Sequence, residues 1–389
     1  MSYIDGYFDR QADIIRVVER QNKERVFKEY PIKYTFYHED PGGKFKSTTG
    51  KTLSRIVCKN TKDFHKELAI NRNKTLFESD INPIFQCLSE NYLNKDAPDL
   101  NIAFFDIEAD FDPEKGFSQP SDPFMPITAI TVSLQWLDTM VTFAMPPKTM
   151  GMEEAKEITK GIDNLYLYKD EADMLKAFLD IIEDADVISG WNSEGYDLPY
   201  IINRIKKVMS KDDTRRLCLW KQMPKKRTFE RFGREQETYD LVGRVHLDSL
   251  ELYRKYTYEE RHSYRLDAIG EHEIGEKKTV YEGSLDQLYN QDFRTFVEYN
   301  RQDVALLDKL DRKLRFIALS NELAHANTVL LQTTLGAVAV TEQAIINEAH
   351  RRGVQVPNRP KRDDNSTTAA GAYVAYPRKG LHSWIGSMD

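Results

Sequence analysis

The chain has 389 residues, of which 40% are hydrophobic, and a formal net charge of −7 at pH 7. This length predicts two or three domains, and the composition is that of a soluble globular protein. No apolar run is long enough to cross a bilayer and the N-terminus lacks a signal-peptide pattern, so we expect a cytoplasmic protein without a membrane partner. Three widely spaced cysteines exclude a disulfide framework and a cysteine-based zinc site.

The first hundred residues alternate strand-like segments with turns. Strands are expected at residues 14–18, 34–37 and 55–58. A helix is predicted from Thr61 to Asn71, with Thr61 as its cap. The polar segment 94–99, which contains a proline, indicates a boundary.

A different order of elements begins after this boundary. It comprises strands at 102–109, 127–136 and 140–145, a helix at 170–183, a strand at 186–189 and a helix at 198–208. Three strands, a helix, a strand and a helix are the opening order of the ribonuclease H-like fold. We therefore expect an α/β domain of that type.

The rest of the chain predicts a charged β-hairpin and further helices. The hairpin spans 225–240, with its turn at Phe232-Gly233. A long helix is expected from about 292 to 324, and another from about 335 to 351. Basic clusters occur at 206–207, 225–227 and 351–352, although each alone is explained by a solvated face.

Asp106 and Glu108 lie two residues apart on a predicted strand, so their side chains emerge on the same face. Their neighbours on the strand are apolar, and two adjacent acids there require a neutralising cation. Hard ions such as Mg²⁺ favour such oxygen ligands. An isolated pair of this kind is better explained by chance on an exposed edge.

Two further clusters change that interpretation. Asp197 follows a strand end, where α/β sheets gather ligand groups, although it is also placed to cap the helix that starts at Leu198. Tyr299 and Asp303 are four residues apart and share one face of the long helix. Alone they would be read as a surface pair, but a tyrosine there can orient a water molecule.

Together the clusters supply four carboxylates and one tyrosine. Four acids can hold two divalent ions roughly 3.5–4 Å apart, the arrangement that hydrolyses phosphodiester bonds. No serine or cysteine nucleophile with a matching base is evident, and no Gly-x₄-Gly-Lys phosphate loop occurs. The sequence therefore predicts a two-metal nuclease.

The clusters at 104–108, 191–197 and 299–303 resemble the three motifs of the proofreading 3′→5′ exonuclease of family B DNA polymerases. The tyrosine makes the chain similar to the DEDDy subclass, and segments 190–204 and 244–253 are especially similar to the T-even-like bacteriophage type. The resemblance implies four parts of the chain. These are an N-terminal mixed α+β domain (1–100), completed by a return segment (335–380), a ribonuclease H-like exonuclease domain (101–334) and the first residues of a polymerase palm (381–389).

The resemblance also implies roles for single residues. It makes Asp106, Glu108, Asp197 and Asp303 the ligands of two Mg²⁺ or Mn²⁺ ions, and Tyr299 the residue that positions the attacking water. Three residues are expected to contact DNA: Asn192, Tyr196 and, by stacking on bases, Phe117. The hairpin would help to separate primer from template. Asp389 would be a palm metal ligand in an incomplete polymerase site.

The implied function is the proofreading portion of a phage DNA polymerase, acting in the cytoplasm of an infected bacterium. It would release nucleoside monophosphates from single-stranded or frayed DNA 3′ ends, and would not polymerise DNA without a C-terminal polymerase portion or complementing fragment. An alternative is a nucleic-acid-binding or docking half of a split polymerase, with RNA as a partner of the N-terminal domain. A natural split half and a truncated chain remain equally open.

Overall fold

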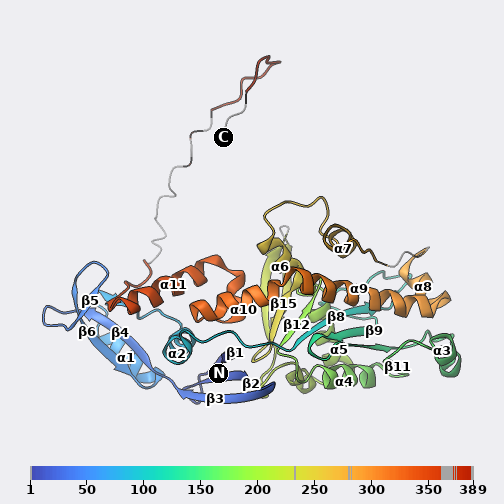
Figure 1. Cartoon of the computed structure of the whole chain (residues 1–389), viewed down its shortest axis with the longest axis horizontal. Coiled ribbons are helices and arrows are strands. Elements are labelled where there is room, and N and C mark those ends of the chain that lie inside the picture. The colour runs from blue at the N-terminus through green and yellow to red at the C-terminus, as the bar shows by residue number, and fades with distance from the viewer. Residues whose placement is uncertain are drawn as a thin grey trace.

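The structure, a computed structural model, describes residues 2–231, 234–278, 281, 283–360, 371, 373 and 375–386, with the side chains of 229–231, 234 and 235 left undescribed. The molecule is elongated (Figure 1). A small sheet with helix α1 (Thr61–Ile70) lies at one end, and a larger α/β body occupies the other. Helices α10 (Phe316–Asn327) and α11 (Ala337–Arg351) run back from the body toward the small sheet.

A six-stranded sheet forms the centre of the α/β body, in the order β11-β10-β9-β8-β12-β15. Its strands are β8 (Ile102–Ala109), β9 (Ile127–Leu134), β10 (Thr139–Ala144), β11 (Leu165–Leu167), β12 (Val187–Gly190) and β15 (Val245–Asp248). β8, β9 and β10 form an antiparallel meander, whereas β12 and β15 run parallel to β8. The predicted ribonuclease H-like fold is thereby confirmed.

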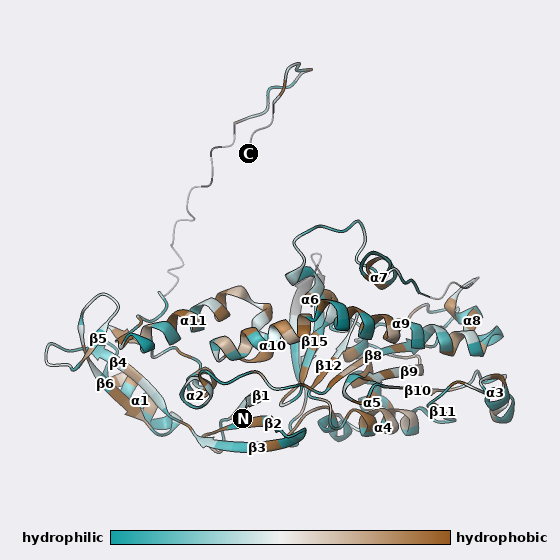
Figure 2. Cartoon of the chain, viewed as in Figure 1, coloured by the Kyte–Doolittle hydropathy of each residue, from teal (hydrophilic) through white to brown (hydrophobic). Residues whose placement is uncertain are grey.

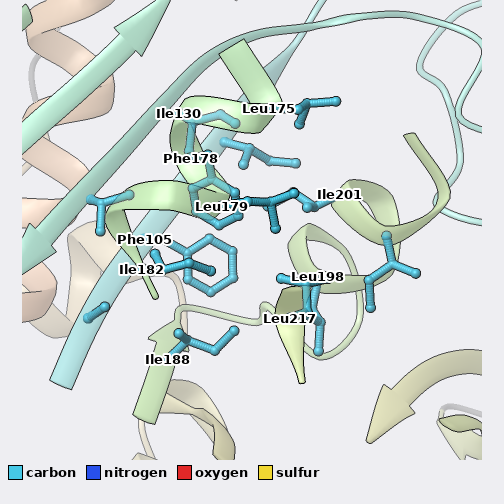
Figure 3. Close-up of a cluster of buried hydrophobic side chains, with 14 of the residues drawn as sticks. Phe105, Ile130, Leu175, Phe178, Leu179, Ile182, Ile188, Leu198, Ile201 and Leu217 are labelled. Carbon is cyan, nitrogen blue, oxygen red and sulfur yellow. The ribbon is translucent and has the colours of Figure 1, made fainter. Parts of the chain in front are cut away.

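Side chains of β8 point alternately to the two faces of the sheet, and each face carries its own hydrophobic core. Phe105 and Ile107 face α4 (Glu171–Ile181) and α5 (Asp197–Val208), where they pack with side chains such as Phe178 and Ile201 (Figure 3). Phe104 points to the opposite side, into the core that includes Val304 of α9 (Phe293–Leu314). The strands are largely hydrophobic, and the helices that cover them carry both hydrophobic and hydrophilic residues, as amphipathic helices do (Figure 2). Asp106 and Glu108 therefore fall on the α9 side of the sheet.

The remaining described elements of the body connect these layers. They are the 3₁₀ turns Gln135–Leu137, Asp212–Leu217 and Leu331–Leu335, helices α3 (Met152–Ile158), α6 (Ser249–Tyr256), α7 (Leu266–Ile274) and α8 (Leu285–Gln291), and the hairpin strands β13 (Lys225–Arg231) and β14 (Arg234–Asp240). The hairpin has the predicted antiparallel register, with Lys225 opposite Asp240. Across the described ranges, no helix is both long and apolar enough to span a membrane.

Three local predictions were wrong. The helix expected over 292–324 is two helices, because Arg315 adopts a left-handed conformation (φ 54°) and ends α9 without any glycine or proline signal. The strand expected to reach residue 136 ends at Leu134, where a 3₁₀ turn begins. The cap of α1 is Asn60, whose side chain accepts a hydrogen bond from the Asp63 amide (2.7 Å), while the Thr61 hydroxyl donates to Asp13.

The N-terminal part contains two small sheets. One is the antiparallel sheet of β1 (Ser2–Asp9), β2 (Ile14–Gln21) and β3 (Glu24–Pro31). The other has the order β16-β5-β6-β4-β7, and comprises β4 (Tyr34–Glu39), β5 (Phe45–Ser47), β6 (Thr52–Cys58), β7 (Leu76–Phe77) and β16 (Val354–Gln355). Both sheets share a core with α2 (Pro83–Tyr92). β16 pairs in parallel with β5, so the chain returns to this sheet after α11.

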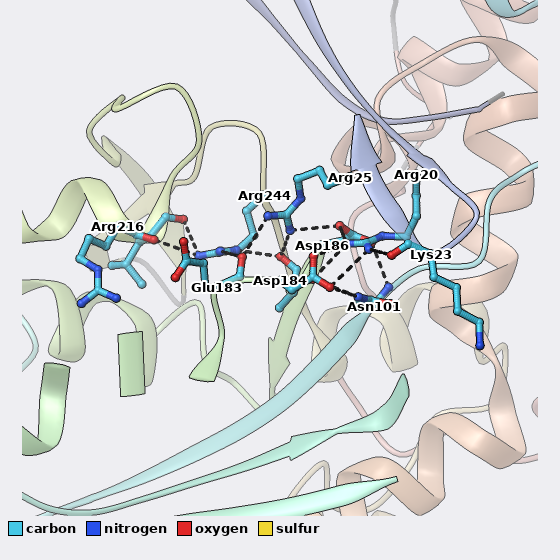
Figure 4. Close-up of polar contacts among 11 residues, drawn as sticks. Arg20, Lys23, Arg25, Asn101, Glu183, Asp184, Asp186, Arg216 and Arg244 are labelled. Atoms are coloured by element: carbon cyan, nitrogen blue, oxygen red, sulfur yellow. Dashed lines mark hydrogen bonds and ion pairs between the residues drawn. The ribbon is translucent and has the colours of Figure 1, made fainter. Parts of the chain in front are cut away.

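A buried ion pair joins the N-terminal part to the α/β body (Figure 4). Asp186, which has no exposed surface, precedes β12 and accepts two hydrogen bonds from Arg20 of β2 (2.6 and 2.7 Å). It also accepts from Arg25 Nη2 (3.2 Å) and from the Asn101 amide (3.0 Å), just before β8. One carboxylate thus fixes β2 against the start of two central strands.

We predict that Asp186→Asn lowers the free energy of unfolding by about 3–5 kcal/mol, because Arg20 would stay buried with only the half-exposed Asp184 as a counter-charge. Urea denaturation measures this loss. The matched control is Asp180→Asn, in the exposed ion pair with Arg216, where a change of about 1 kcal/mol or less is expected. Equal losses in the two variants would show that the buried pair does not hold the two parts together.

Candidate active site

Three carboxylates meet where β8 passes beneath α9. Single oxygen atoms of Asp106, Glu108 and Asp303 lie within 4.8 Å of one another. The first two emerge from alternate positions of β8, and Asp303 comes from the buried face of α9, where it is 2% exposed. Alternate residues of a strand point to the same face, so Asp106 and Glu108 both point toward α9, and Asp303 points back at them from that helix.

The fourth carboxylate, Asp197, approaches from the other side of β8. Its Oδ1 accepts a hydrogen bond from the Ile107 amide (3.4 Å), between the two acidic residues of the strand, and its charge raises the pKa of Asp106. Asp197 is the first residue of α5, and the cap position belongs to Tyr196, which makes no side-chain capping bond. The alternative that Asp197 caps this helix was therefore wrong.

Burial, together with the charges of neighbouring acids, raises the pKa of each of these carboxyl groups. Burial raises the pKa of Glu108 to about 8, that of Asp197 to about 7 and that of Asp303 to about 6. The pKa of Asp106 is raised for the same reason, and the charges of Asp197 and Asp303 raise it further. A bound divalent cation would favour the ionised carboxylates and would neutralise their negative charge.

Lys278 places a positively charged side chain next to the carboxylates. Its ammonium group contacts Asp303 Oδ2 and donates to the Tyr299 hydroxyl at 3.2 Å. Burial alone would lower the pKa of Lys278, but the charges of Asp303 and Asp106 outweigh burial and raise the pKa, so that Lys278 stays charged. Sequence reasoning missed this residue, because it follows α7 in a charged stretch that reads as solvated surface and carries no periodic signal.

Asn300 is a second residue that sequence reasoning missed. It has no exposed surface, and its Nδ2 donates to Asp106 Oδ2 at 2.7 Å. A signal was present, because Asn300 stands three residues after Val297 and four before Val304 in the apolar stripe of α9. A polar residue at a buried period position indicates a partner inside the core.

Tyr299 lies next to Asp303 through their common contact with Lys278. Its ring packs edge-on against Tyr281, with centroids 5.2 Å apart, and its hydroxyl accepts a hydrogen bond from the same Lys278 ammonium that contacts Asp303. The predicted pair Tyr299 and Asp303 is therefore brought to one place. The hydroxyl is positioned to hydrogen-bond a small polar molecule at the acids.

The donor set fits a hard divalent cation. Carboxylate oxygens are the ligands that Mg²⁺ prefers. Asp303 Oδ1 and Asn300 Oδ1 are buried and have no hydrogen-bond partner among the described residues, which leaves acceptor atoms available at the cluster. Unsatisfied buried oxygens are costly unless a cation or water binds them.

The loop between β12 and α5 carries the predicted DNA contacts, Asn192 and Tyr196. It begins at Gly190, where a Cβ atom would stand 2.8 Å from the Phe105 carbonyl oxygen, so that only glycine lets β12 lie so close to β8. Asn192 adopts a left-handed conformation (φ 60°), and the Tyr196 ring stacks on Tyr200 at 5.3 Å. The loop thus leads directly into Asp197.

The other predicted site residues are not joined to the carboxylates by any contact that the described part of the chain shows. Phe117 is 67% exposed and packs against Phe111 at 4.8 Å. Its loop is held on α5, where Asn203 donates to the Pro120 carbonyl oxygen at 2.7 Å. Asp389 lies outside the described residues, as does the hairpin turn at 232–233.

Comparisons with known proteins match a large part of the chain, including Asp106, Glu108 and Asp197, to one family. Residues 56–269 match the family described as DNA polymerase family B, exonuclease domain. The chain is 25% identical to the DNA-directed DNA polymerase of Escherichia phage RB69 over 96% of the chain and 44% of that relative. It is 25% identical to the DNA-directed DNA polymerase of Enterobacteria phage T4 over 61% of the chain and 26% of that relative. It is 30% identical to the bovine (Bos taurus) DNA polymerase delta catalytic subunit over 55% of the chain and 20% of that relative. The chain spans less than half the length of these relatives.

We predict that the metal-free protein loses stability as pH rises from about 5 to about 8. The folded protein holds protons on Glu108, Asp197 and Asp303 that the unfolded chain has lost in this range, so the free energy of unfolding falls with rising pH. Saturating Mg²⁺ should reduce the fall in Tm, because it replaces those protons. Differential scanning calorimetry in EDTA and in Mg²⁺ measures both, and identical pH profiles in the two would contradict the prediction.

Proposed function

The chain belongs to the family B DNA polymerases, whose exonuclease domain it contains, and from this premise we propose that it hydrolyses DNA from the 3′ end. The proposed substrate is a single-stranded or frayed primer end, and the product is a nucleoside monophosphate. The observation that carries the proposal is the gathering of Asp106, Glu108 and Asp303 within 4.8 Å, with Asp197 beside them. We assign these four side chains as ligands of two divalent ions, with Mg²⁺ as the expected metal.

When bound, such ions supply an activated water and stabilise charge on the phosphate and the leaving oxygen. Tyr299 would orient the attacking water, since its hydroxyl already bonds the Lys278 ammonium that contacts Asp303. Lys278 would hold Tyr299 and Asp303 in place and present its ammonium charge toward a phosphate. Asn300 would fix the Asp106 carboxylate through its 2.7 Å hydrogen bond.

Single-stranded ends suit the surroundings of this site. The loop residues Asn192 and Tyr196 precede Asp197 and can contact a nucleotide that reaches the acids. Phe117 exposes an aromatic face, which stacks on bases irrespective of sequence. A base must leave the duplex before it can stack on such a side chain, so a frayed 3′ end is favoured over a paired one.

Partners beyond the DNA strand are proposed from the relatives. The matched phage proteins are named DNA-directed DNA polymerases and extend beyond the aligned part, so we propose that the chain works with a polymerase portion. Because these relatives come from bacteriophages, we also propose that the chain acts in the cytoplasm of an infected bacterium. RNA binding by the N-terminal part stays a prediction, as do the division into domains and the palm role of Asp389.

Digestion of a 5′-labelled single-stranded oligonucleotide, with Mg²⁺ and with chelator, tests the proposed activity. We expect stepwise shortening from the 3′ end that requires metal. Asp303→Asn should slow it by at least about 100-fold, because a metal ligand is lost. The matched control is Asp308→Asn, on the same helix, which should retain the rate. Metal-independent shortening, or equal loss in both variants, would contradict the site assignment.

Tyr299→Phe should lower kcat by about 10–100-fold and leave Mn²⁺ affinity unchanged, because the hydroxyl orients water and does not bind metal. Single-turnover digestion combined with Mn²⁺ titration separates the two effects. Loss of metal affinity together with rate would make Tyr299 part of the metal site instead.

A further inference from the structure

The loop between β12 and α5 is held from outside at four successive residues. The Trp191 indole donates to the Tyr264 carbonyl oxygen (3.0 Å), and Ser193 Oγ hydrogen-bonds His246 Nε2 (2.9 Å). The amides of Asn192 and Glu194 both donate to Asp248, at 2.9 and 3.0 Å. A loop with this many anchors has its shape fixed before any ligand arrives.

Asp248 is the centre of these anchors. It is the last residue of β15, is 3% exposed, and also caps α6 by accepting from the Leu250 amide (2.9 Å). Its Oδ1 serves the amides of Asn192 and Leu250, and its Oδ2 serves the amide of Glu194. Both oxygens are therefore needed as acceptors, which an aspartate satisfies and an asparagine cannot.

The hydrogen bond that Asp248 accepts from Asn192 falls on a left-handed residue of the loop. Asn192 has φ 60°, a region that asparagine adopts more readily than most residues other than glycine, though an extended or right-handed backbone is still preferred. The hydrogen bond from its amide to a buried carboxylate holds it there. Without that acceptor, the backbone at Asn192 would be free to return to an ordinary conformation, and its side chain would point elsewhere.

We propose that Asp248 is a positioning residue for DNA binding at the exonuclease site, acting through the Asn192 loop. The inference rests on the proposed function for its substrate, and on the structure alone for the geometry of the loop. His246 assists by fixing Ser193 from the same strand, two residues earlier.

Asp248 hydrogen-bonds the loop and none of the metal ligands in the described part of the chain, and its charge reaches them by raising the pKa of Asp197. Asp197 is fixed by α5, whose Leu198 and Ile201 lie in the core against β8, and by its own hydrogen bond to Ile107. Asp106 and Glu108 belong to β8, and Asp303 to α9. A change at Asp248 should therefore loosen the Asn192 loop and leave the carboxylate cluster in place.

The test compares Asp248→Asn with Glu251→Gln, an acid one turn further along the chain in a partly exposed pair with Arg254. In Asp248→Asn we expect KM for a single-stranded oligonucleotide to rise by about 10-fold, with kcat and Mn²⁺ affinity changed by less than about 2-fold. Glu251→Gln should match the unsubstituted protein. An unchanged KM, or a loss of Mn²⁺ affinity equal to the change in KM, would overturn the proposal.

Hydrogen exchange provides a second readout that needs no catalysis. The amides of Asn192 and Glu194 should exchange at least about 10-fold faster in Asp248→Asn, while those of α5 beyond its first turn, which is hydrogen-bonded to Ser193, keep their rates. Unchanged exchange at both amides would overturn the positioning role. If the unsubstituted chain digests no DNA, the proposed function fails, and the exchange result still decides whether Asp248 holds the loop.

Discussion

Four carboxylates gathered in one place, two on the central strand β8 and two on the helices α5 and α9, set the main electrostatic constraint on this fold. Asp106 and Glu108 share the α9 face of β8 with Phe104, and Asp303 faces them from a helix buried on the same side. Such a cluster resists ionisation unless positive charge compensates it. Lys278 supplies one charge, and the orphaned oxygen of Asp303 indicates room for more.

The frame around the cluster is built from separate cores, and this separation keeps the acids in place. β8 lies between the core of α4 and α5 on one side and that of α9 on the other. Asp186 fixes the N-terminal sheet to the starts of β8 and β12, far along the strands from the acids. Asp248 holds the loop at the opposite end of β12. Buried carboxylates at both ends of β12 thus fix the geometry around the cluster, to which we assign the proposed hydrolysis.

The spacing of residues in the sequence predicted much of this arrangement, because within a strand or a helix the spacing alone decides which side chains share a face. The two-residue spacing of Asp106 and Glu108 and the four-residue spacing of Tyr299 and Asp303 gave the correct faces. Lys278 lies in irregular chain, where no period exists, and its contact with Asp303 depends on tertiary packing. The break at Arg315 has the same origin, since packing imposes a left-handed residue that local sequence does not favour.

The raised pKa values of Glu108 and Asp197 imply that the carboxylate cluster exchanges protons for divalent metal. Calorimetric titration of Mn²⁺ at pH 7, in two buffers of different ionisation enthalpy, measures this exchange. We expect binding to release protons, seen as a binding enthalpy that differs between the buffers. Tight binding with the same enthalpy in both buffers would mean that the acids are already ionised in the metal-free protein, and would rule out the exchange.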